Sequence, residues 1–296
     1  MKQQYTLKEL EKKANEIRQD IIKMLVKAGS GHSAGPLDMA DIFTALYFRV
    51  LKHDPKNPSW PERDRLILSN GHICPVRYVA MAHAGYFPKS LLKTLRHIGS
   101  KLEGHPSVKR FAALETTSGP LGEGLSQACG FAYAARIDRV EHNYHVWCLM
   151  SDAEQQEGMT WEAAMFAGKN RLNNLTAIID RNNIQIDGYT EDVMPLEPLR
   201  GKYEAFGWHV MDMNGHDMAE IISTLEEAKA IQEKPVCIIA HTIAGKGVSF
   251  MEKDYKWHGV PPGTSIPGEP EKEKQAKIAL RELRTLEKKI EAADID

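Results

Sequence analysis

The sequence predicts an α/β fold, a mostly parallel sheet with helices on both faces. Two short apolar runs, at residues 146–150 and 175–179, are typical of buried strands, and residues 160–169 between them have helical spacing. A strand, a helix and a second strand in this order form a βαβ unit with parallel strands. At 296 residues the chain is long enough to bury a large core.

Further elements follow the same reasoning along the chain. Turn residues and apolar spacing delimit each of them. We expect helices at residues 5–27, 37–51, 76–84, 125–139 and 218–231, and strands at 65–68, 208–211 and 236–240. The α/β domain should cover residues 1–262, and residues 263–296 should form an extended appendage with a Pro-rich linker and a charged C-terminal helix.

Composition excludes several classes of function. The 38 basic and 40 acidic residues nearly balance and form no basic stripe, so nucleic acid is not an expected partner. No apolar stretch approaches the ~20 residues of a membrane span, and the start of the chain is an amphipathic helix of mixed charge, not a signal peptide. We therefore expect a soluble, cytoplasmic protein. Four cysteines without CxxC spacing are expected to be reduced packing residues, namely Cys74, Cys129, Cys148 and Cys237.

Two polar residues close the strands of the central βαβ unit. Asp152 follows the first strand and Asn182 follows the second. Ligands of parallel sheets collect beyond the carboxyl ends of the strands, where both residues should lie. Mg²⁺ takes oxygen ligands, commonly one or two from side chains and the rest from water and phosphates. This pair therefore predicts a site for a metal and a diphosphate.

Several motifs, taken in order, resemble the N-terminal half of transketolase over residues 10–262. They are SGHSAGPLDMA, LSNGH, EGHPS, GPLGEG, the segment from 152 to 183, NIQIDG, and TIAGKG followed by HG. The resemblance implies the diphosphate-binding domain of a thiamine diphosphate enzyme. It also implies transfer of a two-carbon ketol group from a ketose phosphate to an aldose or aldose phosphate, with the pentose phosphate pathway as its setting.

The resemblance also implies roles for individual residues. Asp152 and Asn182 would bind Mg²⁺ or another divalent cation, with the backbone carbonyl of Ile184. His32, His105 and His258 would contact sugar hydroxyls and assist proton transfer, a task that suits imidazole. Cofactor contacts are implied for His72, Gly119, Pro120, Leu121, Ala153, Asn182 and His258.

Glu157 matches an acid at the family's subunit interface, and a helix N-terminal charge is an equal alternative for it. The other eight histidines are expected to be surface or satisfied core residues. They are His53, His83, His97, His142, His145, His209, His216 and His241.

The sequence departs from the family pattern in two motifs and in the length of the chain. This chain has Ser151-Asp152-Ala153 where the family has GDG, and Gly31-His32-Ser33-Ala34 where the family has GHPG. If position 153 acts through its backbone N–H, alanine keeps the contact at some steric cost. The chain also stops soon after the phosphate-binding half. We therefore expect a split transketolase, whose C-terminal subunit supplies the pyrimidine-binding and C-terminal domains, with two copies of each chain.

Three alternatives remain at this point. The chain could be a subunit of a related enzyme, such as a deoxyxylulose-phosphate synthase or the α subunit of a 2-oxoacid dehydrogenase. It could also be a regulatory protein that kept the cofactor fold without catalysis, an interpretation favoured by the altered residues 151–153. A nicotinamide-binding Rossmann enzyme is disfavoured because no GxGxxG follows a strand.

Overall fold

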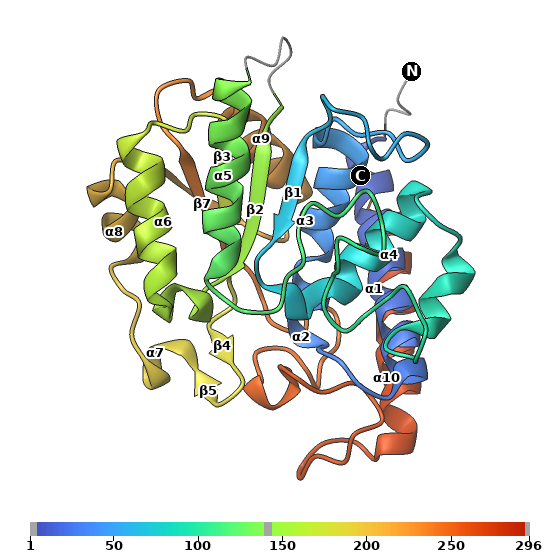
Figure 1. The fold of residues 1–296 in the computed structure, drawn as a ribbon. Helices are drawn as coiled ribbons and strands as arrows, with labels where there is room; N and C mark the ends of the chain where they lie inside the picture. The colour runs from blue at the N-terminus through green and yellow to red at the C-terminus, as the bar shows by residue number, and fades with distance from the viewer. Residues whose placement is uncertain (1–4, 139–143, 294–296) are drawn as a thin grey trace.

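The computed structural model describes residues 5–138 and 144–293 and has three layers, with a sheet between two sets of helices (Figure 1). The five-stranded sheet is parallel throughout, with the strand order β1-β2-β3-β7-β6. Its strands are β1 (Arg65–Leu68), β2 (Val146–Ser151), β3 (Leu175–Arg181), β6 (His209–Asn214) and β7 (Val236–His241). A small antiparallel pair, β4 (Ile184–Gln185) and β5 (Gly188–Tyr189), follows β3.

The sheet has a separate apolar core on each face, because strand side chains alternate. In β2, Trp147 and Leu149 join the core under α1, α3, α4 and α9, whereas Cys148 and Met150 join the core under α5, α6 and α8. The expected sheet with helices on both faces is confirmed. The helices are α1 (Leu7–Ala28), α2 (Ala34–Asp38), α3 (Ala40–Ala45), α4 (Cys74–Ala84), α5 (Glu123–Ile137), α6 (Gly158–Lys169), α7 (Thr190–Val193), α8 (Leu199–Ala205), α9 (Met218–Ala230) and α10 (Lys272–Ala292).

The central βαβ unit is confirmed as β2, α6 and β3, and β2 and β3 pair in parallel. The expected helix at 37–51 is instead divided into α2, α3 and a π-helical turn at Leu46–Val50. Met39 interrupts it with φ −80° and ψ 0°, values outside the α-helical range. The helix expected at 125–139 ends at Ile137, and position 139 lies outside the described residues.

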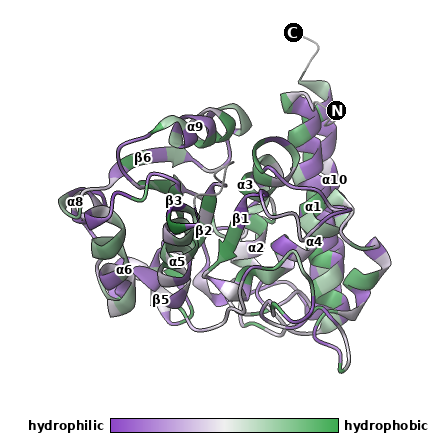
Figure 2. Ribbon diagram, turned by 45° about the horizontal axis from the view of Figure 1, so that its top comes forward, coloured by the Kyte–Doolittle hydropathy of each residue, from purple (hydrophilic) through white to green (hydrophobic). Residues whose placement is uncertain are grey.

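The C-terminal helix packs on the domain instead of extending from it. Helices α1 and α10 lie side by side (Figure 2), and the side-chain amide of Asn15 donates to the carbonyl of Leu283 at 2.8 Å. Ala279 and Leu283 belong to the main apolar core. The expected extended appendage is therefore wrong in its packing, because α10 has an apolar face that α1 buries. The division of the chain at residue 262 stays a prediction.

Candidate active site

A cavity of about 330 Å³ opens at the carboxyl edge of the sheet, beyond the ends of β2 and β3. Loops from distant parts of the sequence meet there because parallel strands all end at the same edge. Most of the residues singled out from sequence line this cavity. They are His32, His72, His105, Gly119, Leu121, Ala153, Asn182, Ile184 and His258.

Three histidines form a compact cluster in the wall of the cavity. The ring centroids of His32 and His72 are 4.7 Å apart, those of His72 and His258 5.3 Å, and those of His32 and His258 5.4 Å. The hydroxyl of Ser33 donates to the carbonyls of Trp257 (3.1 Å) and Val260 (2.6 Å). The serine that departs from the family motif thus ties the loop of His32 to the loop of His258.

Burial keeps these imidazoles neutral. It lowers the pKa of His32 to about 3 and that of His258 to about 4, and it holds the pKa of His72 well below its usual value. Nearby imidazoles act in the same direction on His32 and His72. Within the described residues, Nδ1 of His32 and Nδ1 of His258 have no hydrogen-bond partner. A neutral imidazole with a free ring nitrogen can donate a hydrogen bond to a ligand or accept one from it.

His105 lies at the mouth of the same cavity and is more exposed than the cluster. Its ring lies beside Gly119, where an added Cβ would be 3.7 Å from the ring. Burial, with a contribution from Arg96, lowers its pKa. His105 therefore joins the EGHPS loop to the GPLGEG loop at the cavity entrance.

Asp152 is fully buried just behind the cavity. Its Oδ1 accepts the N–H of Ala153 at 2.6 Å, and its Oδ2 accepts the N–H of Asn183 at 2.8 Å and a guanidinium N–H of Arg181 at 3.1 Å. Burial raises the pKa of the Asp152 carboxyl, and Arg181 opposes that rise. The backbone N–H at position 153, a candidate cofactor contact, is thus already bonded to Asp152.

Arg181 also binds two acids on the segment that follows β5. Its guanidinium pairs with Glu191, and with Glu197 at 3.1 Å. Sequence reasoning did not find this arginine, although a basic residue at the end of an apolar strand is an unusual signal. Arg181 therefore connects the buried Asp152 to two acids of the segment 190–197.

Asn182 belongs to a second buried network. Its Nδ2 donates to Asp38 Oδ2 at 3.1 Å and to Asp180 Oδ2 at 3.0 Å, and its Oδ1 accepts the N–H of Ile184 at 3.1 Å. Burial raises the pKa of Asp180 to about 7 and that of Asp38 well above its usual value. Asp180 raises the pKa of Asp38 further, whereas the charge of Asp152 adds to the rise at Asp180 and Asp38 opposes it. The Asn182 amide therefore lies between two buried carboxyl groups.

Glu154 is a further buried acid that sequence reasoning missed. Its carboxylate accepts the hydroxyl of Ser69, the N–H of Gly122 at 2.7 Å and the N–H of Ser151 at 3.1 Å. Burial raises its pKa to about 7. Gly124 needs to be a glycine here because an added Cβ would lie 2.3 Å from the Ser69 Cβ. Glu154 thus fixes the GPLGEG loop to the ends of β1 and β2.

Pro120 and Glu157 were also singled out from the sequence, and both are exposed. Pro120 does not line the cavity, whereas Glu157 does.

Several of the other histidines have hydrogen-bond partners away from the cavity, as expected. His83 binds Asp20, His145 binds Thr176, and His216 binds Asp41 and the N–H of Ile243. His142 lies outside the described residues.

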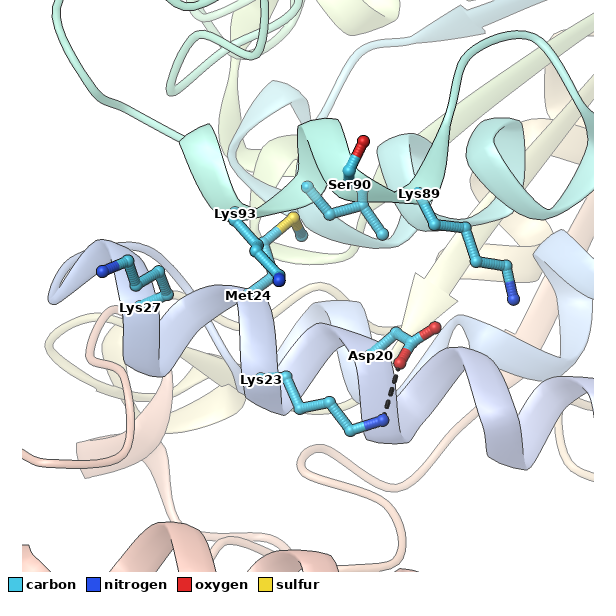
Figure 3. A pocket seen from close by; sticks show the side chains of 8 residues that line it. Asp20, Lys23, Met24, Lys27, Lys89, Ser90 and Lys93 are labelled. Atoms are coloured by element: carbon cyan, nitrogen blue, oxygen red, sulfur yellow. Dashed lines mark hydrogen bonds and ion pairs between the residues drawn. The ribbon is translucent and has the colours of Figure 1, made fainter.

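A wider hollow of about 430 Å³ lies between α1 and the 3₁₀-helix η3 (Lys89–Thr94) (Figure 3). Lysines from both elements point toward it, and Asp20 pairs with Lys23 at 2.8 Å. No histidine of the described residues lines this hollow, so it lacks the groups that distinguish the cavity at the strand ends. We therefore assign the candidate active site to the cavity at the strand ends.

The rest of the described chain adds three findings. All four cysteines are free and buried, as expected from their spacing. Among residues 5–138 and 144–293, no helix is long and apolar enough to cross a membrane, and no group of three or more His, Cys, Asp or Glu side chains is placed to hold a metal.

Comparison with known proteins matches residues 10–274 to the thiamine diphosphate binding domain of transketolase. The chain is 46% identical over 252 residues to a 6-deoxy-6-sulfo-D-fructose transketolase subunit of Clostridium sp. (strain MSTE9), covering 85% of this chain and 91% of that one. It is 40% identical over 278 residues to a subunit of the apulose-4-phosphate transketolase of Actinobacillus succinogenes, covering 93% and 96%.

A solved transketolase structure from Campylobacter jejuni superposes with a TM-score of 0.81 at 33% identity. The match covers 98% of this chain and 48% of that one, so the chain spans about half of the transketolase whose structure it resembles. The two relatives named as subunits are instead covered almost in full. The chain belongs to the transketolase family, as the N-terminal, thiamine diphosphate-binding subunit of a ketol-transferring enzyme.

Proposed function

We propose that this chain, together with a C-terminal partner, transfers a two-carbon ketol unit from a ketose phosphate to an aldose or aldose phosphate. The observation that carries the proposal is one cavity that gathers His32, His72, His105 and His258 beside Asn182, with Asp152 directly behind. When bound, thiamine diphosphate supplies the electron sink for breaking the carbon–carbon bond. The chain's own residues bind, orient and exchange protons around it.

We propose Asp152, Asn182 and the carbonyl of Ile184 as the protein ligands of Mg²⁺ or a similar cation. The donor set fits: Asp152 Oδ1 and Asn182 Oδ1 each accept one hydrogen bond, so each keeps a lone pair. Carboxylate, amide and carbonyl oxygens are the hard ligands that Mg²⁺ takes, and diphosphate and water would complete the set. The Gly119–Leu121 loop, which leads into α5, is our proposed contact for the phosphates.

The histidines have two proposed tasks. His32, His105 and His258 hold hydroxyls of the sugar and move protons to and from them, while His72 and His258 contact the cofactor. Their neutral state supports this, because a neutral imidazole can both donate and accept a proton or hydrogen bond. The free Nδ1 atoms of His32 and His258 are suited to such contacts.

The proposed partner is a C-terminal subunit with the pyrimidine-binding and C-terminal domains, in an assembly with two copies of each chain. Exposed apolar side chains on the segment after β3 support a docking surface at the cavity. Ile186 lines the cavity and is 64% exposed, and Tyr189, Val193 and Met194 are exposed close by in the sequence. Glu157, exposed at the same cavity, is our candidate for a contact across a subunit interface.

The substrates we propose are anionic sugars. Subunits similar to this chain carry the names of a sulfo-sugar and of a sugar phosphate, so a negatively charged ketose is the common chemistry. A pentose phosphate in the pentose phosphate pathway remains the donor we propose. The free, buried cysteines suit the reducing cytoplasm, which is our proposed location.

A ketol-transfer assay tests the proposal. The purified chain with thiamine diphosphate and Mg²⁺ should be inactive, and a polypeptide resembling the C-terminal half of transketolase should restore turnover. We expect the restored complex to bury more than ~2,000 Å² of largely apolar surface. Replacing exposed Ile186 by Asp should weaken the assembly, whereas the same change at exposed Ile98 should not. Robust turnover by the chain alone would refute the need for a partner.

A further inference from the structure

Asp38, the last residue of α2, is completely buried beneath the cavity. Its Oδ2 accepts one N–H of the Asn182 amide at 3.1 Å, and its Oδ1 has no hydrogen-bond partner within the described chain. Asp180 Oδ2 accepts from the same Asn182 nitrogen at 3.0 Å, and Thr242 donates to Asp180 from the end of β7. Residues from α2, from the end of β3 and from the end of β7 therefore form one hydrogen-bonded network around this amide.

The two acceptors fix which way the amide faces. A primary amide has two N–H donors on nitrogen and only acceptor sites on oxygen. Because Asp38 and Asp180 take both donors, the nitrogen is held toward the interior and the oxygen toward Ile184. A rotated amide would point N–H groups at a cation, which would repel it.

We infer that Asp38 is a positioning residue, which presents the Asn182 oxygen to the metal–diphosphate group. This inference rests on the proposed function, because it assigns a role relative to the proposed metal. Residues that orient a metal ligand typically change metal affinity by 10–100-fold when they are removed. Without Asp38, only Asp180 and the N–H of Ile184 would hold the amide, and one of its two N–H donors would be unpaired, so its orientation would be less firmly fixed.

The test compares four variants of the full chain. Asp38→Ala removes the acceptor, Asp38→Ser leaves a hydroxyl too short to reach Asn182, and Asp38→Asn keeps an acceptor oxygen at the same position. Asp64→Ala is the matched control, because Asp64 is another buried acid whose side-chain hydrogen bonds come from the N–H groups of Lys52 and His145. Calorimetry of thiamine diphosphate in Mg²⁺, and the Mn²⁺ spin-resonance spectrum with thiamine diphosphate present, give two readouts independent of turnover.

We expect Asp38→Ala and Asp38→Ser to weaken binding at least tenfold and to change the Mn²⁺ spectrum. Asp38→Asn should bind within about threefold of the unaltered chain, a small free-energy difference. Asp64→Ala should bind normally. If Asp38→Ala fails to fold, Asp38→Ser provides the same comparison.

Two results would overturn the inference: normal binding by both shortened variants, or an Asp38→Asn variant as weak as they are. The second would mean that the charge of Asp38 matters and its acceptor does not. Failure of the unaltered chain to bind thiamine diphosphate in Mg²⁺ would instead refute the proposed metal–diphosphate site, and the inference with it.

Discussion

The carboxylate of Glu154 accepts the backbone N–H of Gly122 at 2.7 Å in a fully buried setting. The same carboxylate accepts the hydroxyl of Ser69 and the N–H of Ser151. One side chain thus satisfies donors from three separate segments of the chain, at residues 69, 122 and 151. Such a group contributes to stability mainly because its loss would leave buried donors without acceptors.

Replacing Glu154 by Ala should lower the free energy of unfolding by about 3 kcal/mol or more, since three buried donors would lose their acceptor. Urea unfolding followed by circular dichroism would measure the change. Glu157→Ala is the control, because Glu157 is exposed and should alter stability by less than ~0.5 kcal/mol. Equal stability of the two variants would contradict the anchoring role of Glu154.

The buried histidines predict that acid weakens the fold. Their pKa values are lowered relative to the usual 6.5, to about 3 for His32 and about 4 for His258, so below pH 6.5 the unfolded chain binds more protons than the folded one. Each such histidine should cost about 1 kcal/mol of stability when the pH falls from 7 to about 5.5.

His258→Gln should reduce this acid-induced loss of stability by the contribution of one histidine. Urea unfolding at the two pH values would measure the free energy of unfolding of each variant. Buried Asp38, Asp180 and Glu154 act in the opposite direction, because their pKa values are raised. The comparison between variants removes that background. His97→Gln is the control, since His97 is exposed. A pH dependence left unchanged by His258→Gln would contradict the assignment.

Asp152→Ala should weaken binding of thiamine diphosphate in Mg²⁺ at least tenfold, or about 1.4 kcal/mol. The expected cause is loss of a cation ligand beside a strongly anionic diphosphate, and excess chelator should abolish binding by the unaltered chain. Calorimetry would give both affinities. Asp187→Ala, in an exposed turn nearby, should bind normally. Unchanged affinity in chelator would rule out the metal assignment.

His105→Ala should lower turnover of the reconstituted enzyme by about 10²-fold, the range for loss of a proton-transfer group. Cofactor affinity should change little, because His105 lies at the cavity mouth, outside the cluster of His32, His72 and His258. Steady-state kinetics and calorimetry separate the two effects. His241→Ala serves as the control, because His241 pairs with Asp212 away from the cavity. A normal rate in His105→Ala would make His105 a structural residue.

Much of the architecture was predictable because it depends on local patterns. The apolar runs of β2 and β3 and the helical spacing of α6 identify the βαβ unit, and the rule for strand ends then brings Asp152 and Asn182 to one edge. The glycine-flanked histidines were found through their motifs. The structure places all four of them at one cavity.

The supporting residues were not predictable, because their partners are distant in sequence. Asp38 meets Asn182 across 144 positions, and Glu154 meets Ser69 across 85. A buried acid has no periodic signature of its own, and its function depends on which donors the fold brings to it. The packing of α10 on α1 was missed for the same reason, since the apolar stripe of a helix does not specify what covers it.

Consecutive side chains at the end of β3 belong to different hydrogen-bond networks. Asp180 and Asn182 join Asp38 beneath the cavity, whereas Arg181 between them pairs with Asp152, Glu191 and Glu197. A shift of β3 by one residue would exchange the two sides, placing a guanidinium where the amide oxygen belongs. The mostly apolar residues 175–179 hold β3 in register with β2 and β7. They therefore help to determine which charged groups face the cavity.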